Sequence, residues 1–322
     1  MSSVIQFSGT VLILLLSLFA CESPTRTVEQ GDVVNLYSNQ LSATDQDLFA
    51  AFESASGLKV NIISRPGGKI LERINTLGDD STNADVLVLK GGEYLYQAQQ
   101  AGILDTLPSS SFLDAVPNHL QDDDQQWLGL AYSAYAIAYR RDSVDTLQVQ
   151  RYQQLADERW QNRLEMAEEQ EAYHSLLASL MADEGRELTQ SWWNSLLKNR
   201  DTNPDSLTLL QLTNSANYRN LPDWGLLFPK PEAYLQLTGA ALREGAPQPK
   251  RAEALFNYLF SREFLRKYAE RYRLFPARTD VEPPSSLYSP ATFRIDTTAQ
   301  SRIARLANNL PPLPQVQETV TP

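Results

Sequence analysis

The sequence predicts an α/β protein with two lobes. Between residues 33 and 102, segments of strand composition alternate with segments of helical periodicity, an order that produces a parallel sheet with helices on both faces. The chain of 322 residues is longer than one hydrophobic core usually fills, so a second lobe with its own core is expected. The hydrophobic content of 42% is close to that of folded globular proteins.

The first predicted elements are a strand, a capped helix and a second strand. Val34 to Tyr37 has the length and apolar character of a strand. Ser42 and Asp45 have the spacing of a capping box, and apolar residues at helical spacing follow them. Gly57 is expected to end this helix, and Leu58 to Ile63 is expected to form the next strand.

A second helix, a buried strand and a third helix continue the alternation. After the turn at Pro66 to Gly68, apolar residues recur at helical spacing up to Leu77. Asp85 to Leu89 is a nearly continuous apolar run, which suits a strand that is buried on both faces of a parallel sheet. Another helix follows, and Gly102 is expected to end it.

The second half of the chain alternates less regularly. Residues 127–130 and 134–139 make one long strand-like segment. One predicted helix carries the adjacent Trp192 and Trp193, which we interpret as packing residues of a core or of the contact between lobes. The other predicted elements are helices at 172–181 and within 252–273, and a strand region at 226–237.

Polar residues follow the first and third predicted strands. Ser38 to Ser42 and Lys90 to Glu93 both lie at carboxyl ends of strands. Ligands of open α/β sheets bind beyond these ends, so we expect both segments to line one side of a ligand cleft. The alternative is that they are only polar turn residues.

The N-terminus predicts a lipid anchor. Val11 to Phe19 is an apolar segment of signal-peptide length that leads into Leu18-Phe19-Ala20-Cys21. This resembles the signal of bacterial lipoproteins, which is cut before a cysteine that is then lipidated. We therefore expect residues 1–20 to be a signal peptide, Cys21 to carry the lipid, and residues 21–32 to be a tether. The alternative is an ordinary apolar leader with an incidental cysteine.

Charge and residue content argue against several classes of protein. The net charge of -11 leaves no basic stripe for phosphates, so no nucleic-acid partner is expected. Cys21 is the only cysteine, which excludes an internal disulfide. The chain has two histidines, His119 and His174, and lacks the common hydrolase, metalloprotease and nucleotide-binding motifs. We interpret His119 as a surface loop residue, and catalysis by carboxylates is not tested by sequence alone.

Seven segments follow one another along the chain: LYSNQLSATDQDLFAAFESASGLKVNII, ILERINTLGDDSTNADVLVL, AGIL, WLGLAYSAYAIAYRRDSVD, YQQLADERWQNRL, SLLASLMADEG and GLLFP. In sequence and in order they resemble the ferric-iron class of periplasmic solute-binding proteins that serve ABC importers. The likeness extends over about residues 33 to 290. It implies the type II periplasmic-binding-protein fold, in which two lobes, each a mostly parallel sheet flanked by helices, close on a ligand at a hinge.

The resemblance also implies where the lobes divide. The N-terminal lobe is expected to contain residues 33–130 and 233–272, and the C-terminal lobe residues 131–232 and 273–309. Residues 310–322 are rich in proline and are expected to be a disordered tail.

A receptor of this kind implies a location and partners. The chain is expected to be an extracytoplasmic, periplasmic lipoprotein that is held at a membrane through Cys21. It would act as a monomer, capture a ferric ion or another small solute, and deliver it to an ABC permease and its ATPase. Neither enzymatic activity nor a cofactor is expected, because Fe³⁺ would be the transported ligand.

The ligand-binding positions depart from the pattern of the family. Relatives place a His, often followed by Tyr, after the first strand, where Leu41 and Ser42 stand here, and some carry a Glu where Lys90 stands. The residues expected to contact the ligand are Tyr173, Tyr218, Asn217 and Tyr135 from the second lobe, and Gln40 and Lys90 from the first. Among these, Tyr173 and Tyr218 are the candidate metal ligands.

These departures argue against a bare ferric ion. Ferric iron favours anionic oxygen, and phenolate ligands ionise because of the charge of the metal itself. A lysine ammonium about 5 Å from a unit positive charge costs about 3 kcal/mol at an effective dielectric constant near 20, and a trivalent ion multiplies this cost. Iron held partly by exogenous anions, or an iron chelate, therefore remains a candidate ligand.

Other interpretations stay open at this point. The same fold could bind an anion or a small organic solute through Lys90 and the amides at helix starts. The chain could also be a non-transport lipoprotein or a carboxylate-based enzyme. For the individual residues, each tyrosine could be a half-buried packing residue, and Lys90 a solvated loop charge.

Overall fold

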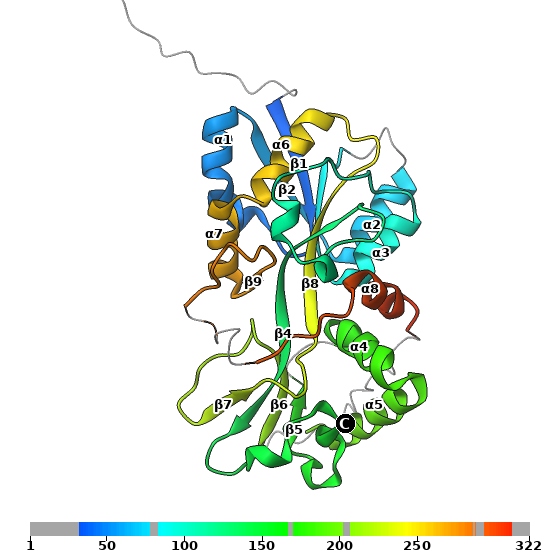
Figure 1. Cartoon of the computed structure of the whole chain (residues 1–322), viewed down its shortest axis with the longest axis vertical. Helices are drawn as coiled ribbons and strands as arrows, with labels where there is room; N and C mark the ends of the chain where they lie inside the picture. Colours follow the sequence, from blue (N-terminus) through cyan, green and yellow to red (C-terminus); the bar gives the residue numbers. More distant parts are fainter. Residues whose placement is uncertain are drawn as a thin grey trace, which may run out of the picture.

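The structure, a computed structural model, describes residues 32–77, 83–166, 170–201, 207–285, 287 and 293–310. It shows two lobes stacked along the long axis of the molecule (Figure 1), which confirms the predicted fold class. The expected signal peptide, Cys21, nearly all of the tether and the tail beyond residue 310 lie outside the described residues. Within the described ranges, no helix is both long and apolar enough to cross a membrane.

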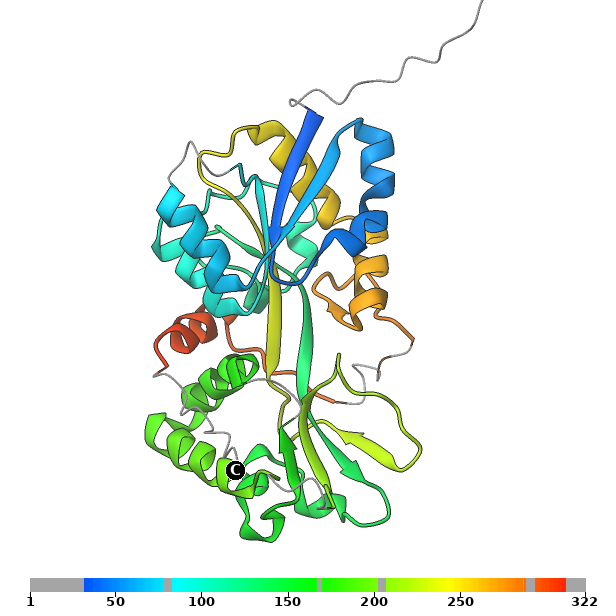
Figure 2. The ribbon, with the colours of Figure 1, turned by 180° about the vertical axis from the view of Figure 1, so that it is seen from behind.

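The first lobe follows the predicted alternation of strands and helices. Its sheet has the strand order β2-β1-β3-β8-β4, and β2, β1 and β3 are parallel. Helices α2 and α3 lie on one side of the sheet, and α1, α6 and α7 lie on the other (Figures 1 and 2). The bounds are β1 (Val33–Ser38), β2 (Lys59–Ser64), β3 (Val86–Lys90), α1 (Ala50–Ser56), α2 (Gly67–Leu77), α3 (Gly92–Gln100), α6 (Pro249–Leu259) and α7 (Arg262–Tyr272).

The helix predicted after Ser42 begins as a 3-10 helix, η2 (Ala43–Phe49), and continues as α1. The N–H of Ser42 donates to Asp45 Oδ2 at 2.8 Å, and the Ser42 hydroxyl accepts from the N–H of Thr44. Gly57 ends α1 with φ of 73°, a left-handed conformation that glycine adopts without steric cost. Both predicted boundaries are confirmed.

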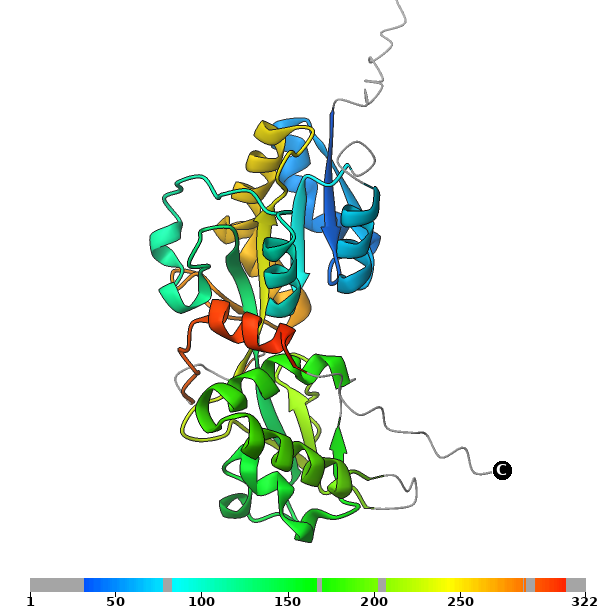
Figure 3. The same cartoon turned by 90° about the vertical axis from the view of Figure 1, so that its right-hand side faces the viewer.

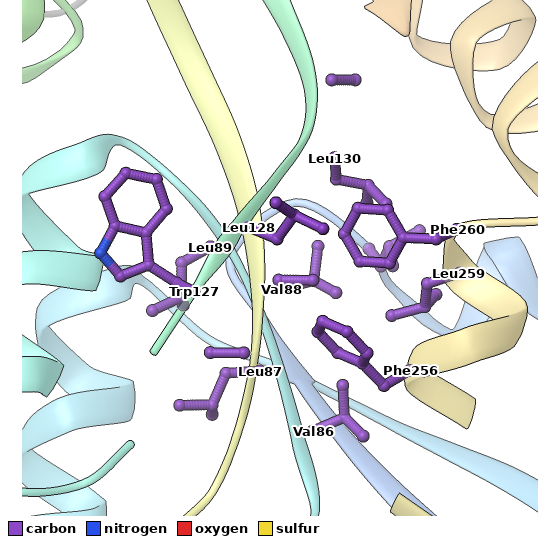
Figure 4. Close-up of a cluster of buried hydrophobic side chains, with 14 of the residues drawn as sticks. Val86, Leu87, Val88, Leu89, Trp127, Leu128, Leu130, Phe256, Leu259 and Phe260 are labelled. Atoms are coloured by element: carbon purple, nitrogen blue, oxygen red, sulfur yellow. The ribbon is translucent and has the colours of Figure 1, made fainter. Parts of the chain in front are cut away.

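The core of the first lobe surrounds β3. Val86 and Val88 face Phe256 and Phe260 on one side of the sheet, while Leu87 and Leu89 lie on the side of Trp127 (Figure 4). These four side chains of β3 are fully buried, as predicted for a strand covered on both faces. Burying one Val, Leu or Phe side chain contributes about 1.5–3 kcal/mol to stability, so this layer holds the strand ends in place.

Two neighbouring strands connect the lobes. The predicted long strand is β4 (Leu128–Arg140), which runs from the first lobe into the second. It pairs antiparallel with β8 (Leu235–Leu242), which also pairs antiparallel with β3. The strand region predicted at 226–237 is divided between β7 (Trp224–Leu227) and β8. The hinge is therefore a two-stranded ribbon.

The second lobe has its own sheet and core. β4 pairs antiparallel with β6 and with β7. Among the described strands of this lobe, the parallel pairing expected from the resemblance is limited to β5 with β6. Trp192 and Trp193 are buried in the second core, as predicted. The remaining bounds are β5 (Leu164–Met166), β6 (Leu210–Asn214), α4 (His174–Glu184) and α5 (Arg186–Asn199), with 3-10 helices at η3 (Leu113–Ala115), η4 (Asn118–Leu120), η5 (Thr146–Gln148), η6 (Tyr152–Ala156), η7 (Glu158–Trp160) and η8 (Gln170–Tyr173).

The chain after α7 contacts both lobes. β9 (Phe275–Pro276) pairs with β4, and Leu274, Phe275 and Ala277 belong to the first core, although residues 273–309 were expected in the C-terminal lobe. Helix α8 (Gln300–Asn308) lies between α3 and α4, at the junction of the lobes (Figure 3). The expected lobe boundaries remain a proposal, and this packing favours moving residues 274–277 to the first lobe.

Candidate functional site

The candidate site lies where the strand ends of the first lobe meet the second lobe beside β8. Thr238 on β8 donates to Gln40 Oε1 in the first lobe at 2.8 Å. Gln236, two residues earlier on the same face of the strand, accepts from Asn214 Nδ2 at 3.2 Å and donates to the carbonyl oxygen of Ala172 at 3.2 Å. One face of β8 therefore connects the polar residues of both lobes.

Gln40 is held by hydrogen bonds that fix the loop after β1. Its Oε1 accepts from the Tyr268 hydroxyl at 2.9 Å as well as from Thr238, and its backbone oxygen accepts from the Tyr272 hydroxyl at 3.0 Å. Burial raises the pKa of Tyr268 well above its usual value, and burial next to the Asp45 carboxylate raises the pKa of Tyr272. Both phenols therefore stay protonated and act as donors.

Lys90 is fixed through its backbone. The Lys90 N–H donates to Asn39 Oδ1 at 2.7 Å, and Asn39 Nδ2 donates to the Lys90 carbonyl oxygen at 2.8 Å. Ser38 binds the neighbouring strand in a similar way, because its hydroxyl donates to the carbonyl oxygen of Val88 at 2.8 Å. The structure thus brings together the two segments expected at the cleft, Ser38 to Ser42 and Lys90 to Glu93.

Tyr173 and Tyr135 lie inside the second core. Tyr173 is fully buried, and its hydroxyl donates to the carbonyl oxygen of Leu212 at 2.9 Å. Tyr135 is also fully buried, and its hydroxyl donates to the carbonyl oxygen of Ala172. Buried phenols generally find such backbone acceptors, and the two rings stack with centroids 6.3 Å apart. Their contacts are those of packing residues.

Tyr218 and Asn217 lie in the turn after β6. The Tyr218 side chain is buried, and its hydroxyl donates to the carbonyl oxygen of Trp224 at 3.1 Å. Asn217 is exposed, and its N–H donates to the carbonyl oxygen of Asn214 at 2.9 Å. The hydroxyls of Tyr173 and Tyr218 thus donate to two different backbone carbonyl oxygens. Metal binding by this pair stays a prediction, and these hydrogen bonds do not support it.

One contact between the lobes joins Glu93, in a segment that is expected to line the cleft, with His174, which is not among the predicted site residues. His174 begins α4 in the second lobe, and its Nδ1 lies 3.9 Å from Oε1 of Glu93 on α3 in the first lobe. The two side chains are 25% and 8% exposed. The signal was present, because Glu93 closes the predicted strand-end segment and His174 directly follows Tyr173.

His119, expected in a surface loop, is half-buried instead. It lines a cavity of ≈ 240 Å³ together with Tyr132 and Phe275. Burial lowers the pKa of His119, and Asp296 opposes this change. This cavity lies beside β9 and η4.

The donor set of the candidate site is sparse for a metal held by protein alone. In the ranges that the structure describes, no three His, Cys, Asp or Glu residues form a cluster that could hold a metal ion. The groups near the strand ends are mostly neutral amides and hydroxyls. The ionisable residues there include Lys90, at the end of β3, together with Glu93 and His174. Such a site suits a solute that brings some of its own ligands.

Two lobes on a two-stranded hinge, with polar strand ends facing the second lobe, define the class of two-lobed solute-binding proteins. The sequence model of the family described as "Bacterial extracellular solute-binding protein" matches residues 81–298, and the chain belongs to this family. The chain is also 27% identical to iron uptake protein A1 of Synechocystis sp. over 298 residues, which cover 84% of this chain and 82% of that protein.

Solved structures show the same architecture. A Trichodesmium protein in complex with iron and citrate ligands has a TM-score of 0.74 and 25% identity, covering 85% of this chain and 96% of that one. The ferric binding protein from Campylobacter jejuni has a TM-score of 0.75 and 22% identity, with coverage of 85% and 96%. The periplasmic-binding-protein fold expected from the sequence is confirmed.

Proposed function

We propose that this chain is the substrate-binding receptor of an ABC importer and that it captures extracytoplasmic iron(III) as a complex with small anions. Membership in the solute-binding family supports the receptor role. Two relatives at 27% and 26% identity are named iron uptake proteins, which supports iron as the cargo. The Trichodesmium structure with iron and citrate supports an anion that accompanies the metal.

The observation that carries the choice of a complex over a bare ion is the direction of the tyrosine hydroxyls. Tyr173 and Tyr218 donate to backbone carbonyl oxygens at 2.9 and 3.1 Å. A phenolate ligand would lose this hydrogen bond and leave the carbonyl without its donor, which costs about 1–3 kcal/mol when the group is buried. An exogenous carboxylate or hydroxycarboxylate supplies anionic oxygen without this cost, and Lys90 near the strand ends favours its charge.

The membrane anchor and the partners belong to the same proposal. Lipidation of Cys21 would hold the receptor at the membrane surface, and the monomer would deliver its solute to a permease and its ATPase. Substituting Cys21→Ser should abolish incorporation of labelled fatty acid into the full-length protein. Labelling that persists in this variant would contradict the anchor and leave the ligand proposal unaffected.

Titration calorimetry with ferric citrate, iron-free citrate and ferric nitrilotriacetate tests the ligand. We expect one ferric citrate per chain, much weaker binding of citrate alone, and no strong visible band from iron bound to tyrosinate. Absence of ferric citrate binding would overturn the iron proposal. Equal binding of citrate with and without iron would favour an organic-anion receptor, and a strong tyrosinate band would restore Tyr173 and Tyr218 as metal ligands.

A further inference from the structure

Glu93 and His174 place one carboxylate and one imidazole on opposite sides of the junction between the lobes. Oε1 of Glu93 and Nδ1 of His174 are 3.9 Å apart, which is too far for a hydrogen bond. Both groups lie at ends of elements that form the candidate site, since Glu93 follows β3 and His174 begins α4. Imidazole nitrogen and carboxylate oxygen are both donor atoms that bind iron in proteins.

The carboxylate of Glu93 is held in place by its own turn. Gly91 has φ of 102°, and a Cβ atom at this position would lie 2.8 Å from Oε1 and 3.0 Å from Oε2 of Glu93. Only glycine allows the carboxylate to lie this close to the backbone while the chain keeps that conformation. The side chain is 8% exposed, so its position is set by packing rather than by solvent.

The imidazole of His174 is oriented by the residue before it. Tyr173 is locked in the second core through its hydrogen bond to Leu212 and its contact with Trp193, whose ring centroid is 5.9 Å away. Because successive residues of a helix point about 100° apart, a buried Tyr173 turns His174 toward the first lobe. The sequence predicts Tyr173 as a ligand, whereas in the structure its neighbour His174 lies at the junction.

Resting on the proposed function, we propose that Glu93 Oε1 and His174 Nδ1 bind the iron of the captured complex, one from each lobe. Metal–ligand distances of about 2.0–2.2 Å would place the two atoms about 3 Å apart on one ion. The lobes would therefore approach each other by about 1 Å at this point, a small hinge movement. The anions of the complex would occupy the other positions of the metal, because the described residues offer no third donor of this kind.

Because the iron would bind to both lobes, it would stabilise the closed state of the receptor, which citrate alone would not do. A ligand stabilises the closed state only by as much as it binds that state better than the open one. An ion that bridges Glu93 and His174 makes both bonds only when the lobes are close. The metal, rather than its anion, would then be the signal that closes the receptor.

The two histidines of the chain make this proposal testable by NMR. In full-length protein labelled with ¹⁵N-histidine, gallium(III) citrate serves as a diamagnetic substitute for ferric citrate. We expect a large shift of the Nδ1 resonance of His174 at one equivalent and an unchanged His119 spectrum. Glu93→Gln and His174→Gln should each weaken ferric citrate binding by about tenfold or more, while the controls Glu187→Gln, on the exposed surface of α5, and His119→Gln should not.

The outcomes separate the two proposals. If the unmodified protein binds neither metal complex, the iron function fails and this inference fails with it. If it binds both complexes but the His174 resonance stays in place, or both site variants bind as the unmodified protein does, the function stands and the Glu93–His174 site is refuted. Thermal unfolding of each variant, within a few degrees of the unmodified protein, shows that a loss of binding is not a loss of folding.

Discussion

Replacing Tyr173 by phenylalanine separates a packing role from a metal-binding role. The substitution removes one neutral hydrogen bond, from the hydroxyl to the carbonyl oxygen of Leu212 at 2.9 Å, in a fully buried position. A net contribution of about 1 kcal/mol is typical of such a bond. For domains of 150–250 residues, about 1 kcal/mol corresponds to a shift in Tm of about 2–4 °C. We therefore expect a clear but small loss of stability in Tyr173→Phe.

Urea unfolding followed by tryptophan fluorescence measures this loss, because Trp193 lies against Tyr173 in the second core. Ferric citrate titration of the same variant should give the affinity of the unmodified protein. The half-buried Tyr96, on α3, provides a matched Tyr→Phe control for effects of the substitution itself. An affinity loss of tenfold or more in Tyr173→Phe, with stability unchanged, would refute our reasoning and make the phenol a ligand.

Three further predictions concern contacts that do not involve the ligand. Gly92→Ala should destabilise the protein by about 1 kcal/mol or more, because the new Cβ would lie 3.1 Å from Cβ of Ala304, whereas Gly68→Ala, with nothing within 4 Å, should cause no loss in urea unfolding. Ser42→Ala should cost about 1 kcal/mol through loss of the cap of η2, measured in the same way. Hydrogen bonds from Arg278 and Arg262 lower the pKa of Asp280. The ion pairs of Asp280 therefore stabilise the fold above the unfolded-state pKa of about 3.9, and this stability is lost as the pH falls toward the folded-state pKa. Asp280→Asn should lower the free energy of unfolding slightly at pH 7, and its difference from the unmodified protein should shrink at about pH 3.

Local patterns were sufficient to predict the elements of the first lobe. The spacing of Ser42 and Asp45, the helix stop at Gly57 and the apolar run before Lys90 each depend on neighbours within a few residues. The carboxyl ends of β1 and β3 meet at one edge because parallel pairing leaves no other arrangement. This is why the amino-acid sequence alone was enough to locate the strand-end segments of the candidate site.

The choice of individual residues within the site could not be made from sequence. Tyr173 and His174 are adjacent, and a rotation of one helical position decides which of them is buried in the second core. That rotation is set by Trp193, Tyr135 and Leu212, which are distant in sequence. The same applies to β9, whose Phe275 joins the first core through pairing with β4 rather than through any local pattern.

Helix α8 connects these observations to the movement of the lobes. Its Ala304 lies against Gly92 of α3, and Asn308 accepts from Gln97 Nε2 at 2.9 Å, while Ala307 lies in a small cluster with Ala178 of α4. The contacts with α3 include a side-chain hydrogen bond and a close backbone approach. The contacts with α4 are an apolar cluster and a hydrogen bond of 3.5 Å from Arg302 to the carbonyl oxygen of Ala182. When the lobes separate, we expect α8 to stay with α3 and to slide over α4.

Because Gly92 stands between Gly91 and Glu93, the contact with Ala304 also fixes the turn that holds the Glu93 carboxylate. A shift of α8 would therefore move Glu93, the first-lobe residue of the proposed Glu93–His174 site. It would leave His174 in place, since Tyr173 anchors that residue in the second core. Gly92→Ala should consequently weaken ferric citrate binding as well as stability, while Gly68→Ala should change neither. If Gly92→Ala loses stability and keeps full affinity, the position of Glu93 does not depend on α8.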